Sequence, residues 1–349
     1  MVVSRNRTRP VLYIISSLTL AIGVFAWLLA HVTWRDVFDL IRSIHLPLLG
    51  LFFVLSLGMH TVRTLRYRLV LASVGQAPNF FRLFLAVLVR SLCVDLLPAR
   101  SGELVYIYLL RTRLGVELGA ATASFALAFL FDLMALAPLL VVAFLLAGLD
   151  AALSPALLIG AGMVLLLLAI LALQLLPTAL RLAFGACRWL PAPLARFRQW
   201  SRRFLAATHR QIRRARAQGI ATPLFGLSLG VRLFKYSALY ILLLAMLHPQ
   251  GYTLQSLPFP KVFLGLCAAE MAASLPVSGL AGFGAYEGAW AGVFMLLGFP
   301  ATMAKASSIS HHLFTQAYGY LLGGIAAVWL LALPVSSLPP QPARPPPKA

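Results

Sequence analysis

Charged residues are scarce in this chain, and acidic residues are the scarcest. Only 11% of the 349 residues are charged, and nine of them are Asp or Glu. Apolar residues make up 61% of the sequence, and the mean hydropathy is +0.89. A soluble globular domain does not need this composition, and apolar runs of about 20 residues suit membrane-spanning helices. The sequence therefore predicts an all-α polytopic integral membrane protein.

Cysteine and the common catalytic motifs are also scarce. The three cysteines, Cys93, Cys187 and Cys267, are widely spaced without metal-ligand spacing, so we interpret them as small apolar residues. The chain has no nucleophile elbow, no Walker lysine, no His pair at i, i+4 spacing and no Asp-Asp pair of the glycosyltransferase kind. We therefore expect no metal, no cofactor and no enzyme activity. A membrane-embedded transferase is the remaining catalytic alternative.

Positive charge is abundant, because 29 Lys and Arg residues give a net charge of +20. The densest stretch, from Arg181 to Arg216, has ten arginines and no acid, with aromatic residues between them. This pattern predicts a basic cytoplasmic interfacial segment over about 181–218, with guanidinium groups on lipid phosphates. Nucleic acid could use the same composition, but the segment is tethered at both ends to apolar spans, so we expect chiefly a topology anchor and no nucleic-acid partner.

The apolar runs predict six full spans. Under the positive-inside rule, residues 1–10 form a basic cytoplasmic N-terminus, and the proline-rich tail 334–349 is cytoplasmic and disordered. In this prediction the second span ends at a cytoplasmic cluster of Arg63, Arg66 and Arg68. The six spans are Val11–Ala30, Leu46–Thr61, Leu118–Leu149, Leu153–Leu176, Pro223–Leu247 and Thr302–Leu333.

Two breaks interrupt the apolar sequence, and in each a proline is followed by small residues and a glutamate. Proline disfavours helix at the residue before it, and non-helical backbone inside a membrane must be covered by protein or by a water-filled cavity. Paired breaks indicate an inverted-repeat transporter with its site near the midplane, whereas ordinary interfacial loops are the alternative. We predict two oppositely oriented re-entrant hairpins, about 80–110 and 261–297. The backbone-break residues are Pro98, Gly102, Pro276, Gly279, Gly282 and Gly284.

The first break contains a candidate phosphate site. Arg100, assisted by backbone amides where the second helix begins, is predicted to bind a phosphate. Asp95, Arg100 and Glu103 are expected to form one charged network, because a buried charge needs a partner. The alternative is that this network only holds the hairpin shut.

Further polar residues are expected inside the membrane. In the second break Glu287 lies among glycines, and it either binds substrate or is a packing residue. Asp132 and Glu270 are intramembrane acids that need cationic partners, for which Arg63, Arg66 and Arg90 are the candidates. The last span also carries His311 and His312, which either relay protons or serve as polar packing residues.

The two breaks also carry a family resemblance. The run L-L-P-A-R-S-G-E-L-V-Y-I-Y-L-L-R-T-R-L-G-V, the downstream Asp132 and the run P-V-S-G-L-A-G-F-G-A-Y-E-G resemble the lysylphosphatidylglycerol synthase transmembrane-region family, also called flippase-like proteins. The resemblance covers about Val11 to Leu333. Members are similar to the membrane domain of the bacterial enzyme that makes and flips aminoacylated phosphatidylglycerol, and others are implicated in moving hopanoid or other lipids. The motif points to Pro98, Arg100, Gly102, Glu103, Gly282, Gly284 and Glu287.

The resemblance implies a lipid translocase of the bacterial inner membrane, whose partners are membrane lipids with anionic or phosphate-bearing head groups. A non-transporting membrane subunit that scaffolds a lipid- or glycan-modifying enzyme is the alternative. The chain departs from the family at Ala128 and Phe129, where a glutamate-arginine pair is usual. The resemblance does not extend to the cytoplasmic aminoacyl-transferase domain of the fused enzymes, so we expect no lysyl transfer.

Overall fold

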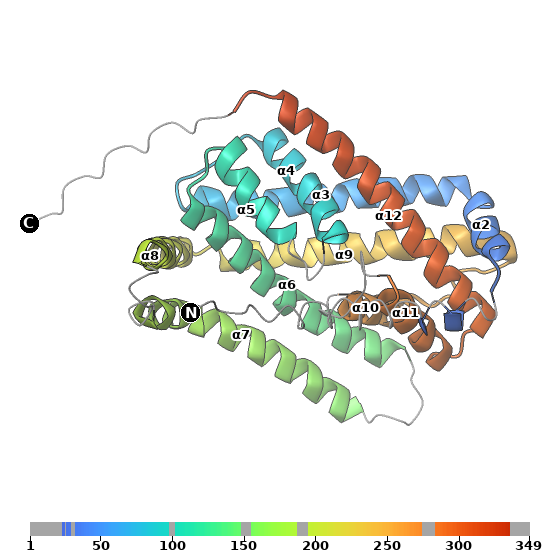
Figure 1. The fold of residues 1–349 in the computed structure, drawn as a ribbon. Coiled ribbons are helices and arrows are strands. Elements are labelled where there is room, and N and C mark those ends of the chain that lie inside the picture. Colours follow the sequence, from blue (N-terminus) through green and yellow to red (C-terminus); the bar gives the residue numbers. More distant parts are fainter. Residues whose placement is uncertain are drawn as a thin grey trace, which may run out of the picture.

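A computed structural model gives the fold of residues 23–24, 26–28, 32–97, 102–147, 155–186, 195–273 and 283–335. These residues form helices joined by short turns and contain no strand (Figure 1), which confirms the all-α prediction. Several predictions lie outside the described residues. They concern residues 1–10, most of the first span, the breaks at Pro98, Arg100, Pro276, Gly279 and Gly282, and nearly all of the tail.

Four of the described helices are long and apolar enough to cross a membrane. They are α3 (Leu46–Ser73), α6 (Leu118–Leu146), α9 (Ala221–Leu247) and α12 (Ala301–Ala332). Each has 27 or more residues, which exceeds the roughly 20 needed to cross the hydrocarbon core. A fifth long helix, α7 (Pro155–Ala186), packs against α6. The chain is therefore a multi-pass membrane protein.

One predicted boundary is wrong. Helix α3 does not end at Thr61 but continues without interruption to Ser73. Arg63 and Arg66 therefore lie within this helix and not beyond its end, and the Arg66 side chain is 1% exposed. A buried arginine needs a counter-charge, so Arg66 requires an acidic partner inside the fold.

Two pairs of short helices occupy the positions of the predicted hairpins. Helix α4 (Phe80–Leu96) packs against α5 (Gly102–Arg113), and α10 (Phe259–Ala273) packs against α11 (Ala285–Leu296). Helix α4 ends at the residue before Leu97, which is extended, as the following Pro98 requires. Helix α11 begins after Gly284, whose φ of +95° favours glycine.

The helices repeat one order of lengths. The order long, short, short, long appears in α3 to α6 and again in α9 to α12. The two first members, α3 and α9, lie side by side and run in opposite directions (Figure 1), and the amide of His45 before α3 donates to the carbonyl of Ala245 near the end of α9, at 2.9 Å. The contacts between the sets are reciprocal, because α12 packs on α4 and α6 packs on α10.

The remaining elements lie at the ends of the long helices. The short helix α2 (Trp34–Arg42) starts with a capping box between Thr33 and Asp36 and packs on α12. A 3₁₀ turn, η4 (His248–Gln250), follows α9. Helix α8 (Ala195–Ala217) is seen nearly end-on in Figure 1, beside the beginning of α9, so it runs across the long helices and not along them.

The hairpin of α4 and α5 is packed so closely that it predicts a stability effect. A Cβ added to Gly102 would lie 2.2 Å from the backbone carbonyl group of Cys93. Since backbone atoms cannot move aside as a flexible side chain can, we expect Gly102→Ala to lower the free energy of unfolding by roughly 1–3 kcal/mol. Thermal unfolding of the purified protein in nanodiscs measures this loss.

The matched control is Gly292→Ala in α11, where an added Cβ meets nothing within 4 Å. In a helix interior this change stabilises by roughly 0.5–1 kcal/mol. Equal effects of the two substitutions would contradict the close packing at Gly102.

Candidate functional site

A polar cavity of about 230 Å³ lies among α3, α4, α9 and α12. Residues of α5 and α6 complete its wall, and its position between four long or hairpin helices puts it at the depth of the spans. Ionisable residues at that depth cost free energy unless they are paired. When they occur there, they often mark a functional site. The charged lining residues among those described are Arg63, Arg90, Arg232 and Lys235 against Asp95, Glu103 and Asp132.

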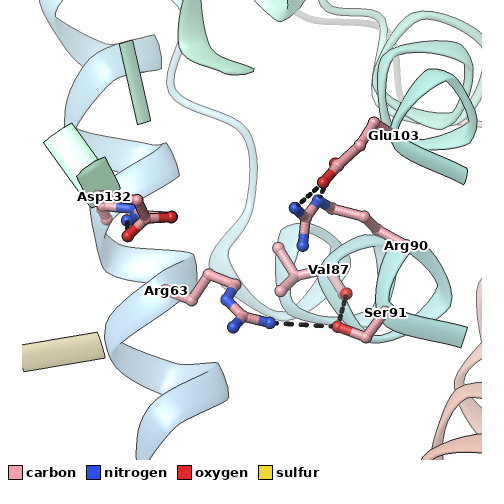
Figure 2. A network of polar contacts seen from close by, with 7 residues as sticks. Arg63, Val87, Arg90, Ser91, Glu103 and Asp132 are labelled. Carbon is pink, nitrogen blue, oxygen red and sulfur yellow. Dashed lines mark hydrogen bonds and ion pairs between the residues drawn. The ribbon is translucent and has the colours of Figure 1, made fainter. Parts of the chain in front are cut away.

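Arg90 and Glu103 join the two helices of the first hairpin. The Nε of Arg90 donates to Glu103 Oε2 at 2.6 Å, and its Nη2 donates to Oε1, so the pair is bidentate (Figure 2). The sequence predicted Arg100 as the partner of Glu103. Among the described residues Glu103 pairs with Arg90, because α5 folds back along α4 and brings its first turn beside Arg90. Arg100 itself lies outside the described residues.

Asp132 links three long helices. Its carboxylate pairs with Arg66 of α3 and lies 3.7 Å from the Nε of Arg232 on α9. The other contact of Arg66 Nη1 is the hydroxyl of Ser228, at 3.2 Å. Arg66 was one of the three predicted candidates for an intramembrane acid, whereas Arg232 was not considered.

Glu270 also has its cation on α9. Its carboxylate pairs with Lys235 and accepts a hydrogen bond of 3.0 Å from the hydroxyl of Tyr236. Arg232 and Lys235 are three residues apart and therefore share one face of the helix. Neither residue was among the predicted site residues. The signal that could have found them is two cations three residues apart within an otherwise apolar span.

Arg63 differs from the other arginines of the cavity. None of the ion pairs among the described residues includes Arg63. Its guanidinium reaches from α3 toward α4, where Nη1 donates to the hydroxyl of Ser91 at 3.3 Å, and that hydroxyl donates to the Val87 carbonyl (Figure 2). A guanidinium has five N–H donors, so most of those on Arg63 remain for a ligand.

A second polar group surrounds Glu287 in the other hairpin. Glu287 is fully buried, and its Oε2 accepts from the amide of Gly284 at 2.7 Å. Its Oε1 meets the Nδ1 of His312, and the Nε2 of that histidine lies 2.8 Å from the amide nitrogen of Gln316. An amide nitrogen only donates, so Nε2 of His312 accepts and Nδ1 donates to Glu287. The Tyr286 ring stacks on the His312 ring at 4.2 Å.

The neighbouring His311 points elsewhere. Its Nε2 lies 3.0 Å from the carbonyl of Leu239, and its ring packs against Trp290. Successive residues on a helix face directions about 100° apart, which is why the two histidines have separate partners. Proton relay through His311 and His312 stays a prediction, as do the substrate-binding roles of Arg63, Arg66, Glu103, Asp132, Glu270 and Glu287.

One of the comparisons with known proteins finds a match. The family model described as "Lysylphosphatidylglycerol synthase TM region" matches residues 14–323. No curated protein and no solved structure matches the chain. The matched range includes both short helix pairs and every charged residue that lines the cavity. The chain therefore belongs to the lysylphosphatidylglycerol synthase TM region family.

Proposed function

We propose that this protein moves a phosphate-bearing lipid between the leaflets of the bacterial cytoplasmic membrane. The observation that carries the proposal is the charged cavity at span depth, in which Arg63 has no acidic partner among the described residues. A cation held in a membrane without a counter-charge is costly. A lipid phosphate that enters the cavity would supply that counter-charge.

The two short helix pairs suit this function. We interpret them as re-entrant hairpins that enter from opposite faces, because the halves α3 to α6 and α9 to α12 run in opposite directions. Six full spans would then place both termini in the cytoplasm. The head group would pass through the cavity while the acyl chains stay in the bilayer, by alternating access or along a groove.

The other charged residues of the cavity have a supporting role in this proposal. Arg66, Arg90 and Lys235 each have an acidic partner, so they hold the helices together around the cavity. Buried pairs of this kind fix an arrangement more than they add stability. Arg63 is therefore the cation that we assign to the phosphate.

Reconstitution of the purified protein tests the proposal. Liposomes would contain phosphatidylglycerol with a fluorescent acyl chain, and a membrane-impermeant reductant would quench the label in the outer leaflet only. We expect the protein to make the inner-leaflet label accessible as well, and protein-free liposomes to keep it protected. Full protection in the presence of folded protein would contradict transport and favour the scaffold alternative.

A further inference from the structure

A basic cleft of about 400 Å³ lies between α7 and α8, apart from the transport cavity. Three of its lining residues come from α7, namely Gln174, Thr178 and Arg181, and three come from α8, namely His209, Arg213 and Arg216. No acid is among the described residues that line it. The positive potential is visible at His209, whose pKa is lowered by partial burial and by the nearby Arg181 and Arg213.

Helix α8 is fixed in place, so the cleft is a built feature and not a loose basic loop. A Cβ on Gly119 of α6 would lie 2.9 Å from the backbone of Ala207, which shows how closely the two helices approach. The amide of Gln211 donates to Glu117 at 3.0 Å. On the α7 side, the guanidinium of Arg202 lies over the Phe184 ring, 4.6 Å from its centre.

An apolar cavity of about 260 Å³ adjoins this cleft. The two share Gln174 and Arg216, so the polar cleft and the apolar cavity meet at these two residues. The rest of the apolar lining belongs to α6, the end of α8 and the start of α9: Leu127, Phe131, Ala215, Ile220, Ala221 and Leu224. The junction lies beside Ala221, the first residue of the candidate membrane span α9.

We propose that the cleft and the adjoining cavity together bind one anionic phospholipid, with its phosphate on Arg181, Arg213 and Arg216 and an acyl chain in the apolar cavity. Arginine suits this task, because its planar guanidinium binds phosphate oxygens in a bidentate manner. Thr178 and Gln174 add hydroxyl and amide groups for the remaining oxygens. A soluble anion has no apolar part and would not fill the apolar cavity. The site shares no residue with the transport cavity and does not depend on the proposed transport.

Native mass spectrometry of the full chain in neutral detergent tests the assignment. The probes are phosphatidic acid, which has a phosphate and acyl chains, phosphatidylcholine, which has the chains without net negative charge, and inorganic phosphate. We expect one phosphatidic acid to bind with clear preference over phosphatidylcholine, and inorganic phosphate not to displace it. The variant Arg181→Gln/Arg213→Gln/Arg216→Gln should bind about a hundredfold more weakly, since each basic residue contributes roughly a factor of five.

Two further variants separate the arginines of the site from general positive charge. The control Arg203→Gln/Arg210→Gln/Arg214→Gln also removes three charges, all of them from residues of α8 that do not line the cleft. This control should retain binding. Ala221→Phe fills the apolar cavity without a charge change, and it should weaken phosphatidic acid binding. Should the triple variant unfold, Arg181→Gln alone takes its place, because that side chain is exposed.

Three results would overturn the proposal. Unchanged binding in the cleft variant would exclude the arginines. An equal loss of phosphatidic acid binding in the control variant would show that binding depends only on the total positive charge of the protein. Displacement by inorganic phosphate together with insensitivity to Ala221→Phe would show that an anion alone occupies the cleft.

Discussion

Arg63→Gln is expected to abolish most transport of anionic lipid while the protein stays folded. Arg63 is the lining arginine without an acidic partner among the described residues, so its removal breaks none of the ion pairs described above. Glutamine keeps a donor for the Ser91 hydroxyl, which now receives a 3.3 Å hydrogen bond from Arg63. What is lost is the charge that would hold the phosphate. Hydrogen bonds to charged groups contribute roughly 1.5–3 kcal/mol, so we expect about a tenfold to hundredfold weaker interaction with the lipid.

The leaflet-selective assay in liposomes measures this effect, with thermal unfolding as the check on folding. Arg68→Gln is the matched control, because Arg68 lies on the same helix, is exposed and does not line the cavity. We expect Arg68→Gln to transport at the parent rate. Parent-level transport by Arg63→Gln would remove Arg63 from the mechanism and return attention to Arg100.

Asp132→Asn should destabilise the protein more than any other single change to the cavity. Asp132 is the ion-pair partner of Arg66, which is 1% exposed, and it also lies near Arg232. Breaking a buried pair by removing one charge costs roughly 3–5 kcal/mol, because the remaining charge has neither water nor a partner. We expect a marked fall of the unfolding temperature in nanodiscs, at any lipid composition.

Asp39→Asn provides the comparison for this prediction. Asp39 also pairs with an arginine, Arg35, but at 3.9 Å and with side chains that are 60% and 90% exposed. Exposed pairs contribute roughly 0–1 kcal/mol, so this change should barely move the unfolding temperature. If Asp132→Asn were equally mild, Arg66 would have to find another counter-charge. The double variant Asp132→Leu/Arg66→Met should recover part of the loss, since neither charge is then left alone.

The sequence was sufficient for the class and for the two helix pairs. Composition alone predicts the membrane protein, and Pro98 and Gly284 mark helix ends by local backbone chemistry that needs no tertiary information. The predicted ranges of about 80–110 and 261–297 correspond to helix pairs that run from Phe80 to Arg113 and from Phe259 to Leu296. Such signals are local, so they can be read without the fold.

The partners of the charged residues were not accessible in the same way. Arg66 looked like part of a cytoplasmic cluster because the charge that neutralises it, Asp132, is 66 positions away. The pairing of Glu103 with Arg90 was not predicted, because it is the fold of the hairpin that brings these two residues together. Lys235 was overlooked for the same reason, since only the fold places it beside Glu270. Pairing depends on tertiary contacts, which local pattern does not contain.

The charge balance of the cavity has an electrical consequence. Four cationic and three anionic side chains among the described lining residues leave one positive charge in excess, and a phosphodiester would cancel it. If the cavity opens to each side in turn, the loaded cavity has no net charge during the change of access. The empty cavity carries one net positive charge when it returns. A membrane voltage acts on such a charge with about 2.3 kcal/mol per 100 mV. Voltage would then change the rate only when the return of the empty protein limits turnover, and a potassium diffusion potential across the liposomes can measure this dependence.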